Sequence, residues 1–230
     1  MGKTLYGVGV GPGDPKQMTL LAVETIGNCP VIAVPAEDRE QAISYRIASR
    51  AVRGLEEKEC LNLSIPMTKD PQILEQNYEL AAARIISCLE ENKDVAYLTL
   101  GDPTIYSTYI YIHRLVKKKG YPAQIINGIP SFCAVAARIG DSLADRSEQL
   151  HIIPSSYQIE EALGYPGNKV FMKAASKLSG VKHTLQEKNM TAIMIENCGL
   201  TDEHIYRTTA SMPEQAGYYT TVLVKEEVHD

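Results

Sequence analysis

The stretch VAYLTLGDPTIYSTY, residues 95–109, is the part of the sequence that decides the fold. Its first six residues are almost wholly apolar, which is typical of a parallel strand that is buried on both faces. Gly101 then permits an unusual backbone conformation or a close approach by a ligand, and Pro103 stiffens the segment that follows. Asp102 is therefore expected at the carboxyl end of a buried strand, the edge at which open α/β sheets bind ligands.

A simpler interpretation treats Asp102 and Pro103 as the cap and first turn of the next helix, which we expect over residues 107–119. That interpretation explains the Asp-Pro pair but does not require Gly101. It also leaves unexplained the small and hydroxyl side chains that surround two tyrosines in this stretch, namely Thr104, Ser107 and Thr108.

Strands and helices alternate on both sides of this stretch. Apolar runs predict strands at 5–10, 31–35 and 123–127, and helical spacing of apolar residues predicts helices at 20–26, 41–52 and 72–91. Such alternation is typical of a parallel sheet wrapped by helices.

The segment GIPS, residues 128–131, interrupts this alternation. Beyond it the pattern predicts strands at 150–153, 170–172, 191–195 and 221–224, and helices at 132–139, 159–163, 178–187 and 202–207. We therefore expect two domains, 1–127 and 128–230. The expected fold class is α/β, with two small domains, each a mixed sheet flanked by helices, and an active-site cleft between them.

Charge and hydropathy are against two classes, nucleic-acid binders and membrane proteins. The net charge of −5 is against a general nucleic-acid binder, although it leaves room for a local basic patch. No apolar run reaches membrane-spanning length, and the first residues, MGKTLYGVGV, lack the apolar core and cleavage site of a signal peptide. We therefore expect a cytoplasmic protein with neither nucleic acid nor membrane among its partners.

The five cysteines and five histidines are widely scattered. No Cys-x-x-Cys occurs, and no two histidines are spaced to share a helical face, so neither a disulfide framework nor a zinc site is indicated. We expect reduced, mostly packed thiols and no protein-bound metal.

A glycine loop, GVGVGPGDP, covers residues 7–15 directly after the first strand. It does not fit the dinucleotide motif G-x-G-x-x-G, because Pro12 and Asp14 stand where the third glycine is needed, and no P-loop occurs. The alternating glycines therefore serve either a ligand that approaches the backbone or a tight structural turn. Taken alone, Ser131 in GIPS is best interpreted as the N-cap of a helix.

Together, VGPGD (10–14), GDP (101–103) and GIPS (128–131) resemble the motifs of the tetrapyrrole methylase family, in order and at suitable separations. The resemblance covers nearly the whole chain. Members of this family use S-adenosylmethionine to methylate uroporphyrinogen-type or precorrin-type rings. The resemblance therefore implies S-adenosyl-L-methionine as cofactor, S-adenosyl-L-homocysteine as product, a tetrapyrrole substrate and a homodimer.

The continuation GDPTIYSTYIY resembles the members that methylate C20 of the ring in cobalamin biosynthesis. The substrate would be cobalt-factor II or precorrin-2, and we favour the cobalt-containing one. The alternatives are a family member that acts at another ring carbon, the diphthamide-forming methylase, which IYSTY fits poorly, and a non-catalytic nucleotide-binding module.

The resemblance also implies site residues. Those expected to bind the cofactor are Val10, Pro35, Gly101, Asp102, Ile105, Tyr106, Ser131, Phe132, Met172, Asn197, Thr220 and Thr221. Asp102 is the candidate catalytic residue, either as the base that removes the C20 proton or as a stabiliser of the cationic intermediate, and the alternative is that it only holds the cofactor.

The substrate carries many carboxylates, so basic side chains are expected to bind it. Lys173 and Arg138 are the candidates that we favour, although exposed basic residues are more often solvated surface charges. Tyr109 is expected to stack on the ring, but a helix that carries it would equally bury it in the core.

Overall fold

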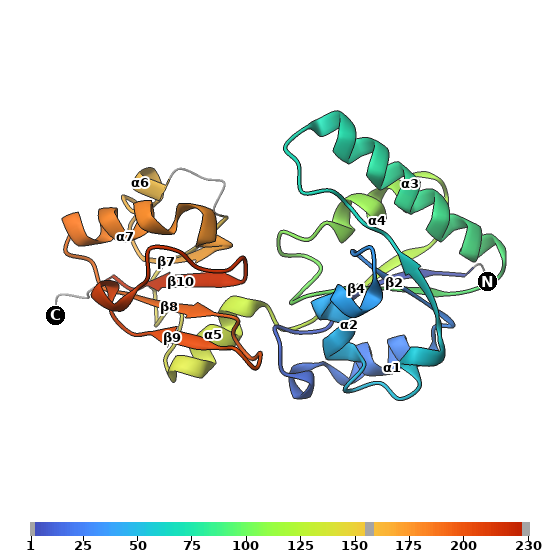
Figure 1. Ribbon diagram of the computed structural model, residues 1–230, viewed down its shortest axis with the longest axis horizontal. Coiled ribbons are helices and arrows are strands. Elements are labelled where there is room, and N and C mark those ends of the chain that lie inside the picture. The colour runs from blue at the N-terminus through green and yellow to red at the C-terminus, as the bar shows by residue number, and fades with distance from the viewer. Residues whose placement is uncertain (1–2, 155–158, 227–230) are drawn as a thin grey trace. The chain divides into compact units, whose positions relative to one another are not determined.

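The computed structural model describes residues 3–154 and 159–226. The chain divides into two compact units, residues 1–130 (unit 1) and 131–230 (unit 2). Each unit contains one five-stranded sheet flanked by helices, so the expected α/β class is confirmed (Figure 1). Among the described residues, no helix has both the length and the apolar character needed to cross a membrane.

The sheet of unit 1 has the order β3-β2-β4-β1-β5. Its strands are β3 (Glu59–Asn62), β2 (Val31–Val34), β4 (Val95–Thr99), β1 (Leu5–Gly9) and β5 (Ala123–Ile126). All four strand pairs are parallel, so the mixed sheet expected in each domain occurs only in unit 2. Parallel pairing agrees with the burial of every residue of β2 and β4.

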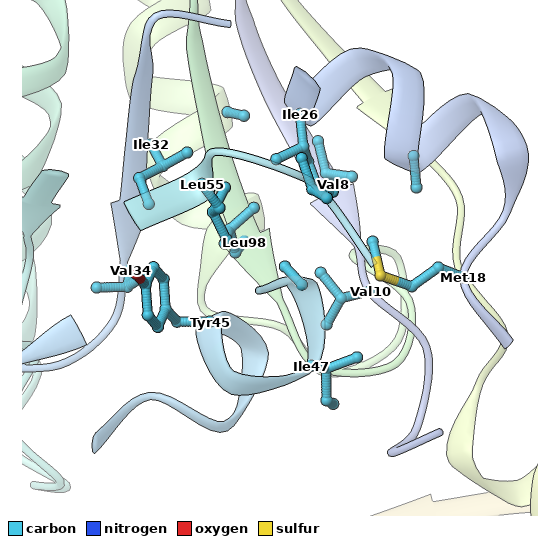
Figure 2. Packing of buried hydrophobic residues seen from close by; sticks show 14 of the residues in the cluster. Val8, Val10, Met18, Ile26, Ile32, Val34, Tyr45, Ile47, Leu55 and Leu98 are labelled. Carbon is cyan, nitrogen blue, oxygen red and sulfur yellow. The ribbon is translucent and has the colours of Figure 1, made fainter. Parts of the chain in front are cut away.

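Helices cover both faces of this sheet (Figure 1). On one face, α1 (Leu20–Asn28) and α2 (Ile43–Ala48) pack over Val8, Ile32 and Leu98 (Figure 2). On the other face, α3 (Pro71–Glu90) and α4 (Tyr109–Lys118) pack over the residues that alternate with these, among them Val31 and Tyr97. The alternation follows from the period of two along a strand.

Unit 2 contains a mixed sheet of order β6-β7-β10-β8-β9. Its strands are β6 (Leu150–Pro154), β7 (Asn168–Met172), β10 (Thr220–Val224), β8 (Ala192–Glu196) and β9 (His204–Tyr206). Only β6 and β7 pair in parallel, and the other three pairs are antiparallel. The helices α6 (Ile159–Ala162) and α7 (Leu178–Glu187) pack on one face against Phe171 and Val222, and α5 (Ser131–Ile139) packs on the other against Ile195.

Three local features differ from the expectations. The helix predicted at 202–207 is absent, and β9 pairs there with β8 as a hairpin. The turn between these strands is held by Asn197, whose side chain donates to Asp202, and by the backbone N–H of Gly199, which donates to Glu203. The strand β3 was not predicted, and α2 is shorter than the expected helix at 41–52 because Asp38 caps a separate 3-10 turn at Arg39–Gln41.

Candidate active site

The three glycine-containing motifs of unit 1 meet at the carboxyl ends of three adjacent strands, β4, β1 and β5. Gly11 follows β1 and Gly101 follows β4, and the two form an isolated antiparallel bridge. The N–H of Gly11 donates to the carbonyl of Gly101 at 3.2 Å, and the N–H of Gly101 donates to the carbonyl of Gly11 at 2.8 Å. Motifs that are far apart in the sequence are therefore joined through their backbones.

The glycines leave no room for side chains at this junction. A Cβ on Gly9 would lie 2.6 Å from both the Gly101 oxygen and the Gly128 nitrogen, and one on Gly128 would lie 2.2 Å from the same Gly101 oxygen. Gly11 and Gly101 also have positive φ angles, of 76° and 70°. The sequence left open a ligand that approaches the backbone or a tight structural turn. These contacts directly support a structural role, in which the glycines allow the strand ends to pack closely together.

Asp102 lies at the centre of this junction and is only 5% exposed. Its Oδ1 accepts hydrogen bonds from the backbone N–H of Thr104 at 2.7 Å and from the Thr104 hydroxyl. Its Oδ2 accepts from the Asn127 side-chain amide and from the Gly128 N–H, each at 3.0 Å. Four donors fill the roughly four lone-pair positions of a carboxylate. We call this set, Asp102 with Thr104, Asn127 and Gly128, the Asp102 latch.

Burial acts to raise the pKa of Asp102, but the hydrogen bonds from Thr104, Asn127 and Gly128 outweigh it and hold the pKa below its ordinary value. The carboxylate is therefore ionised at neutral pH and engaged by groups of the chain itself. A general base needs a pKa near the working pH and a lone pair within reach of the substrate. The geometry is against the predicted catalytic role of Asp102 and favours a role in joining the ends of β4 and β5.

The other expected cofactor residues of unit 1 lie at or next to the same sheet edge. Pro35 is exposed just after β2, and Ile105 is half-buried in the segment after β4. Tyr106 follows with a positive φ of 47° and a side chain that is 46% exposed. Val10 belongs to the core, and its N–H donates to the carbonyl of Thr99 at 2.9 Å.

Tyr109 does not occupy the substrate-contacting position expected for it. It is wholly buried, and its ring fills the space above Gly7, where a Cβ would lie 2.0 Å from a ring carbon. Its hydroxyl donates to the carbonyl of Gln124 at 2.9 Å and lies 2.9 Å from Nδ1 of His113. The alternative, in which the helix buries this ring in the core, is the one that the structure supports.

In unit 2, the expected cofactor residues of the sheet gather at one edge. Met172 ends β7, Asn197 follows β8, and Thr220 and Thr221 begin β10. Because β10 is antiparallel to both neighbours, its first residues lie beside the ends of β7 and β8, and Thr221 is paired with Met172 and Ile195. Thr220 is 1% exposed and donates from its hydroxyl to the Gly217 carbonyl at 2.7 Å.

Lys173 and Asn197 both have positive φ angles next to this edge, 57° and 53°. The ammonium of Lys173 lies 5.5 Å from the ring centroid of Tyr218. The N–H of Asn197 donates to the Tyr219 carbonyl at 3.0 Å. Backbone strain of this kind is often concentrated at functional sites, and both residues were singled out by the sequence.

The three remaining expected site residues lie on α5. Ser131 is its first residue, and Phe132 is 6% exposed. The Nε of Arg138 donates to Glu203 at 2.6 Å, which ties Arg138 to the turn that also contains Asn197. A substrate contact by Arg138 stays a prediction.

The sequence did not indicate the partners of Asp102 or the two tyrosines beside Lys173. Asn127 stands directly before GIPS, at the end of a predicted strand. That position at a strand end could have indicated Asn127 as a site residue. Within residues 3–154 and 159–226, no group of three or more His, Cys, Asp or Glu side chains is placed to hold a metal ion.

The sequence matches the model of one protein family, Tetrapyrrole (Corrin/Porphyrin) Methylases, over residues 4–213. A probable cobalt-precorrin-2 C(20)-methyltransferase of Methanocaldococcus jannaschii is 36% identical over 185 residues, 79% of this chain and 78% of that protein. The cobalt-precorrin-2 C(20)-methyltransferase of Salmonella typhimurium is 27% identical over 99% of this chain and 98% of its own. A precorrin-2 C(20)-methyltransferase of a Sinorhizobium species is 25% identical over 96% of this chain and 94% of its own.

Solved structures show the same fold. The cobalt precorrin-4 methyltransferase CbiF superposes with a TM-score of 0.76 at 17% identity, covering 96% of this chain and 94% of that one. At this identity the likeness shows the fold alone, and it extends over both units.

Proposed function

The chain belongs to the tetrapyrrole (corrin/porphyrin) methylase family, and from that membership we propose that it methylates C20 of a precorrin-2-type ring in cobalamin biosynthesis. The methyl donor is S-adenosyl-L-methionine, and the product of the donor is S-adenosyl-L-homocysteine. The observation that carries this proposal is the 36% identity over 79% of the chain to a protein named for C20 methylation of cobalt-precorrin-2. The GDPTIYSTYIY segment, which follows β4, supports the same position on the ring.

When bound, S-adenosylmethionine supplies a methyl group on a positively charged sulfur. The residues of the chain that we propose to contact it are those at the strand ends of unit 1 and those at the sheet edge of unit 2. The hydroxyls of Thr220 and Thr221 and the side-chain amide of Asn197 are of the kinds that hydrogen-bond a ribose and an amino acid.

The contribution of the protein to the reaction is mainly positioning. Holding a donor and an acceptor carbon in line contributes about 7–11 kcal/mol in well-oriented systems. The Asp102 latch serves this end by fixing the Gly101 segment against the Gly128 segment, since its carboxylate joins both loops. Asp102 is therefore proposed as a positioning residue, and proton removal from C20 is not assigned to it.

We favour a cobalt-containing substrate, cobalt-factor II, over metal-free precorrin-2. The support is that the relatives at 36% and 27% identity are both named for cobalt-precorrin-2, whereas the relative named for precorrin-2 is 25% identical. Parallel incubations of the purified protein with labelled S-adenosylmethionine and each ring test this preference. We expect faster gain of one methyl mass on the cobalt ring, and faster gain on the metal-free ring would reverse the assignment.

A homodimer and a cytoplasmic location are further parts of the proposal. The homodimer comes from the family resemblance, and the cytoplasmic location comes from the sequence, in which no apolar run reaches membrane-spanning length. Light scattering on the purified protein tests the first, with a mass of about twice the 25.3 kDa of one chain expected. A mass of one chain at micromolar concentration would contradict it.

A further inference from the structure

Two neighbouring tyrosines, Tyr218 and Tyr219, stand on the surface of unit 2 immediately before β10. Their side chains are 45% and 40% exposed. The ring centroids are 5.1 Å apart and the ring planes are nearly perpendicular, at 87°. Lys173, which follows β7 directly, places its ammonium 5.5 Å from the centroid of the Tyr218 ring. We call these three residues the aromatic corner.

The backbone beneath the aromatic corner is held on both sides. The N–H of Gly217 donates to the carboxylate of Glu196, and the Thr220 hydroxyl donates to the carbonyl of Gly217 at 2.7 Å. The carbonyl of Tyr219 accepts from the N–H of Asn197 at 3.0 Å. The backbone that carries the tyrosines is therefore fixed by hydrogen bonds. A fixed backbone loses less conformational entropy when a ligand binds to the two rings.

The chemistry of the corner points to a particular class of ligand. Because the two rings are nearly perpendicular, a flat molecule that stacks on one of them can also meet the edge of the other. A large ring system has enough area at its rim to make both contacts. The Lys173 ammonium and the tyrosine hydroxyls are donors that suit carboxylates at such a rim. Glu196, the acidic residue beneath the corner, already accepts from the Gly217 N–H.

We infer that the aromatic corner binds the carboxylate-bearing rim of the tetrapyrrole substrate, an inference that rests on the proposed function. The adenine of S-adenosylmethionine is the competing occupant, because Met172, Thr220 and Asn197 lie next to the corner. Adenine is flat but carries no carboxylate, so Lys173 could form no ion pair with it. The charge of the corner thus favours the substrate.

The test compares binding of two probes to one set of variants. Sirohydrochlorin, a flat ring with peripheral carboxylates, is titrated by its visible absorbance, and S-adenosylhomocysteine is titrated by calorimetry. The variants are Tyr218→Ala/Tyr219→Ala, Tyr218→Phe/Tyr219→Phe and Lys173→Ala. The matched control is Lys188→Ala, which removes an exposed lysine of the same unit, outside the predicted site residues.

We expect the double alanine variant to raise the Kd for sirohydrochlorin about tenfold, whereas the double phenylalanine variant stays within about threefold of the wild type because the rings remain. Lys173→Ala raises the same Kd and weakens its dependence on salt, and Lys188→Ala does neither. The Kd for S-adenosylhomocysteine is unchanged throughout, which also shows that the variants are folded.

Two results would overturn the inference while leaving the proposed function intact. One is an unchanged Kd for sirohydrochlorin in the double alanine variant. The other is a selective loss of S-adenosylhomocysteine binding in that variant, which would assign the corner to adenine. A wild-type protein that binds no tetrapyrrole would instead remove the proposed function, and the inference with it.

Discussion

The carbonyl oxygen of Gly101 occupies the space that a side chain at Gly128 would need, since a Cβ on Gly128 would lie 2.2 Å from that oxygen. The two residues are 27 positions apart in sequence, and each belongs to a different motif at a strand end. This contact accounts for the glycine at position 128, and the positive φ of 70° accounts for the glycine at position 101. The contact also brings Asp102, the neighbour of Gly101, to within 3.0 Å of the Gly128 nitrogen.

Replacing Gly128 by alanine is expected to destabilise unit 1 by about 1–3 kcal/mol, because the added carbon meets backbone atoms that cannot move independently. Chemical denaturation measures this change. Gly27→Ala is the matched control, since no atom lies within 4 Å of its added Cβ and it stands inside α1. The free energy of unfolding of Gly27→Ala should rise by about 0.5–1 kcal/mol. Equal stability of the two variants would contradict the close contact.

Asp102→Asn should lower the free energy of unfolding at pH 7 by about 2 kcal/mol, because the new amide NH₂ must face two of the four donors that now bond to the carboxylate. The pKa of Asp102 is lower in the folded state, so its contribution is present above its ordinary pKa and is lost as the pH falls through the folded-state pKa. The difference between wild type and variant should therefore shrink below about pH 4.

Kinetics of the same Asp102→Asn variant separate a positioning role from a base. A positioning role predicts that the pH profile of kcat keeps its shape while its height falls. Loss of the limb that rises with pH, in a variant that still binds S-adenosylhomocysteine normally, would restore the catalytic assignment. Asn127→Ala removes one donor of the latch and should produce a smaller effect in the same direction.

Tyr109→Phe should cost about 1 kcal/mol of stability and leave the KM for the tetrapyrrole unchanged. The phenol makes a hydrogen bond to Gln124 inside the core, and its ring is not exposed to a substrate. Denaturation and steady-state kinetics measure the two quantities on one sample. A several-fold rise in KM with unaltered stability would support the substrate contact expected from the sequence.

The sequence predicted the framework of the fold because buried strands carry their own signal. The apolar run at 95–100 became β4, and the three motif segments were placed correctly after strands or before a helix. The sequence could not show contacts between residues that are far apart along the chain. Asn127 lies 25 residues from Asp102, and no local pattern indicates that its amide completes the coordination of that carboxylate.

Burial was the second quantity that local patterns left open. Helical spacing put Tyr109 at the start of a helix but could not decide which face would be covered. The decisive residue is Gly7 on β1, whose missing side chain makes the space that the ring fills. The β9 strand was missed for a related reason, since its three residues are stabilised by pairing with β8 rather than by their own propensity.

Binding of the cofactor class can be tested without turnover. S-adenosylhomocysteine at about one hundred times its Kd should stabilise the folded protein by about 2.7 kcal/mol, because it binds only the native state. A rise in Tm measures this stabilisation, with NAD⁺ at the same concentration as the control. Stabilisation by NAD⁺ and none by S-adenosylhomocysteine would contradict the proposed cofactor.

The most direct test of the central claim is the position of the transferred methyl group. The purified protein is incubated with cobalt-factor II and S-adenosylmethionine carrying ¹³C in its methyl group, and the product is examined by mass spectrometry and NMR. We predict a gain of one labelled methyl, with its carbon attached to the meso position C20. A labelled methyl on any other ring carbon, or no transfer to either the cobalt or the metal-free ring, would contradict the C20 assignment.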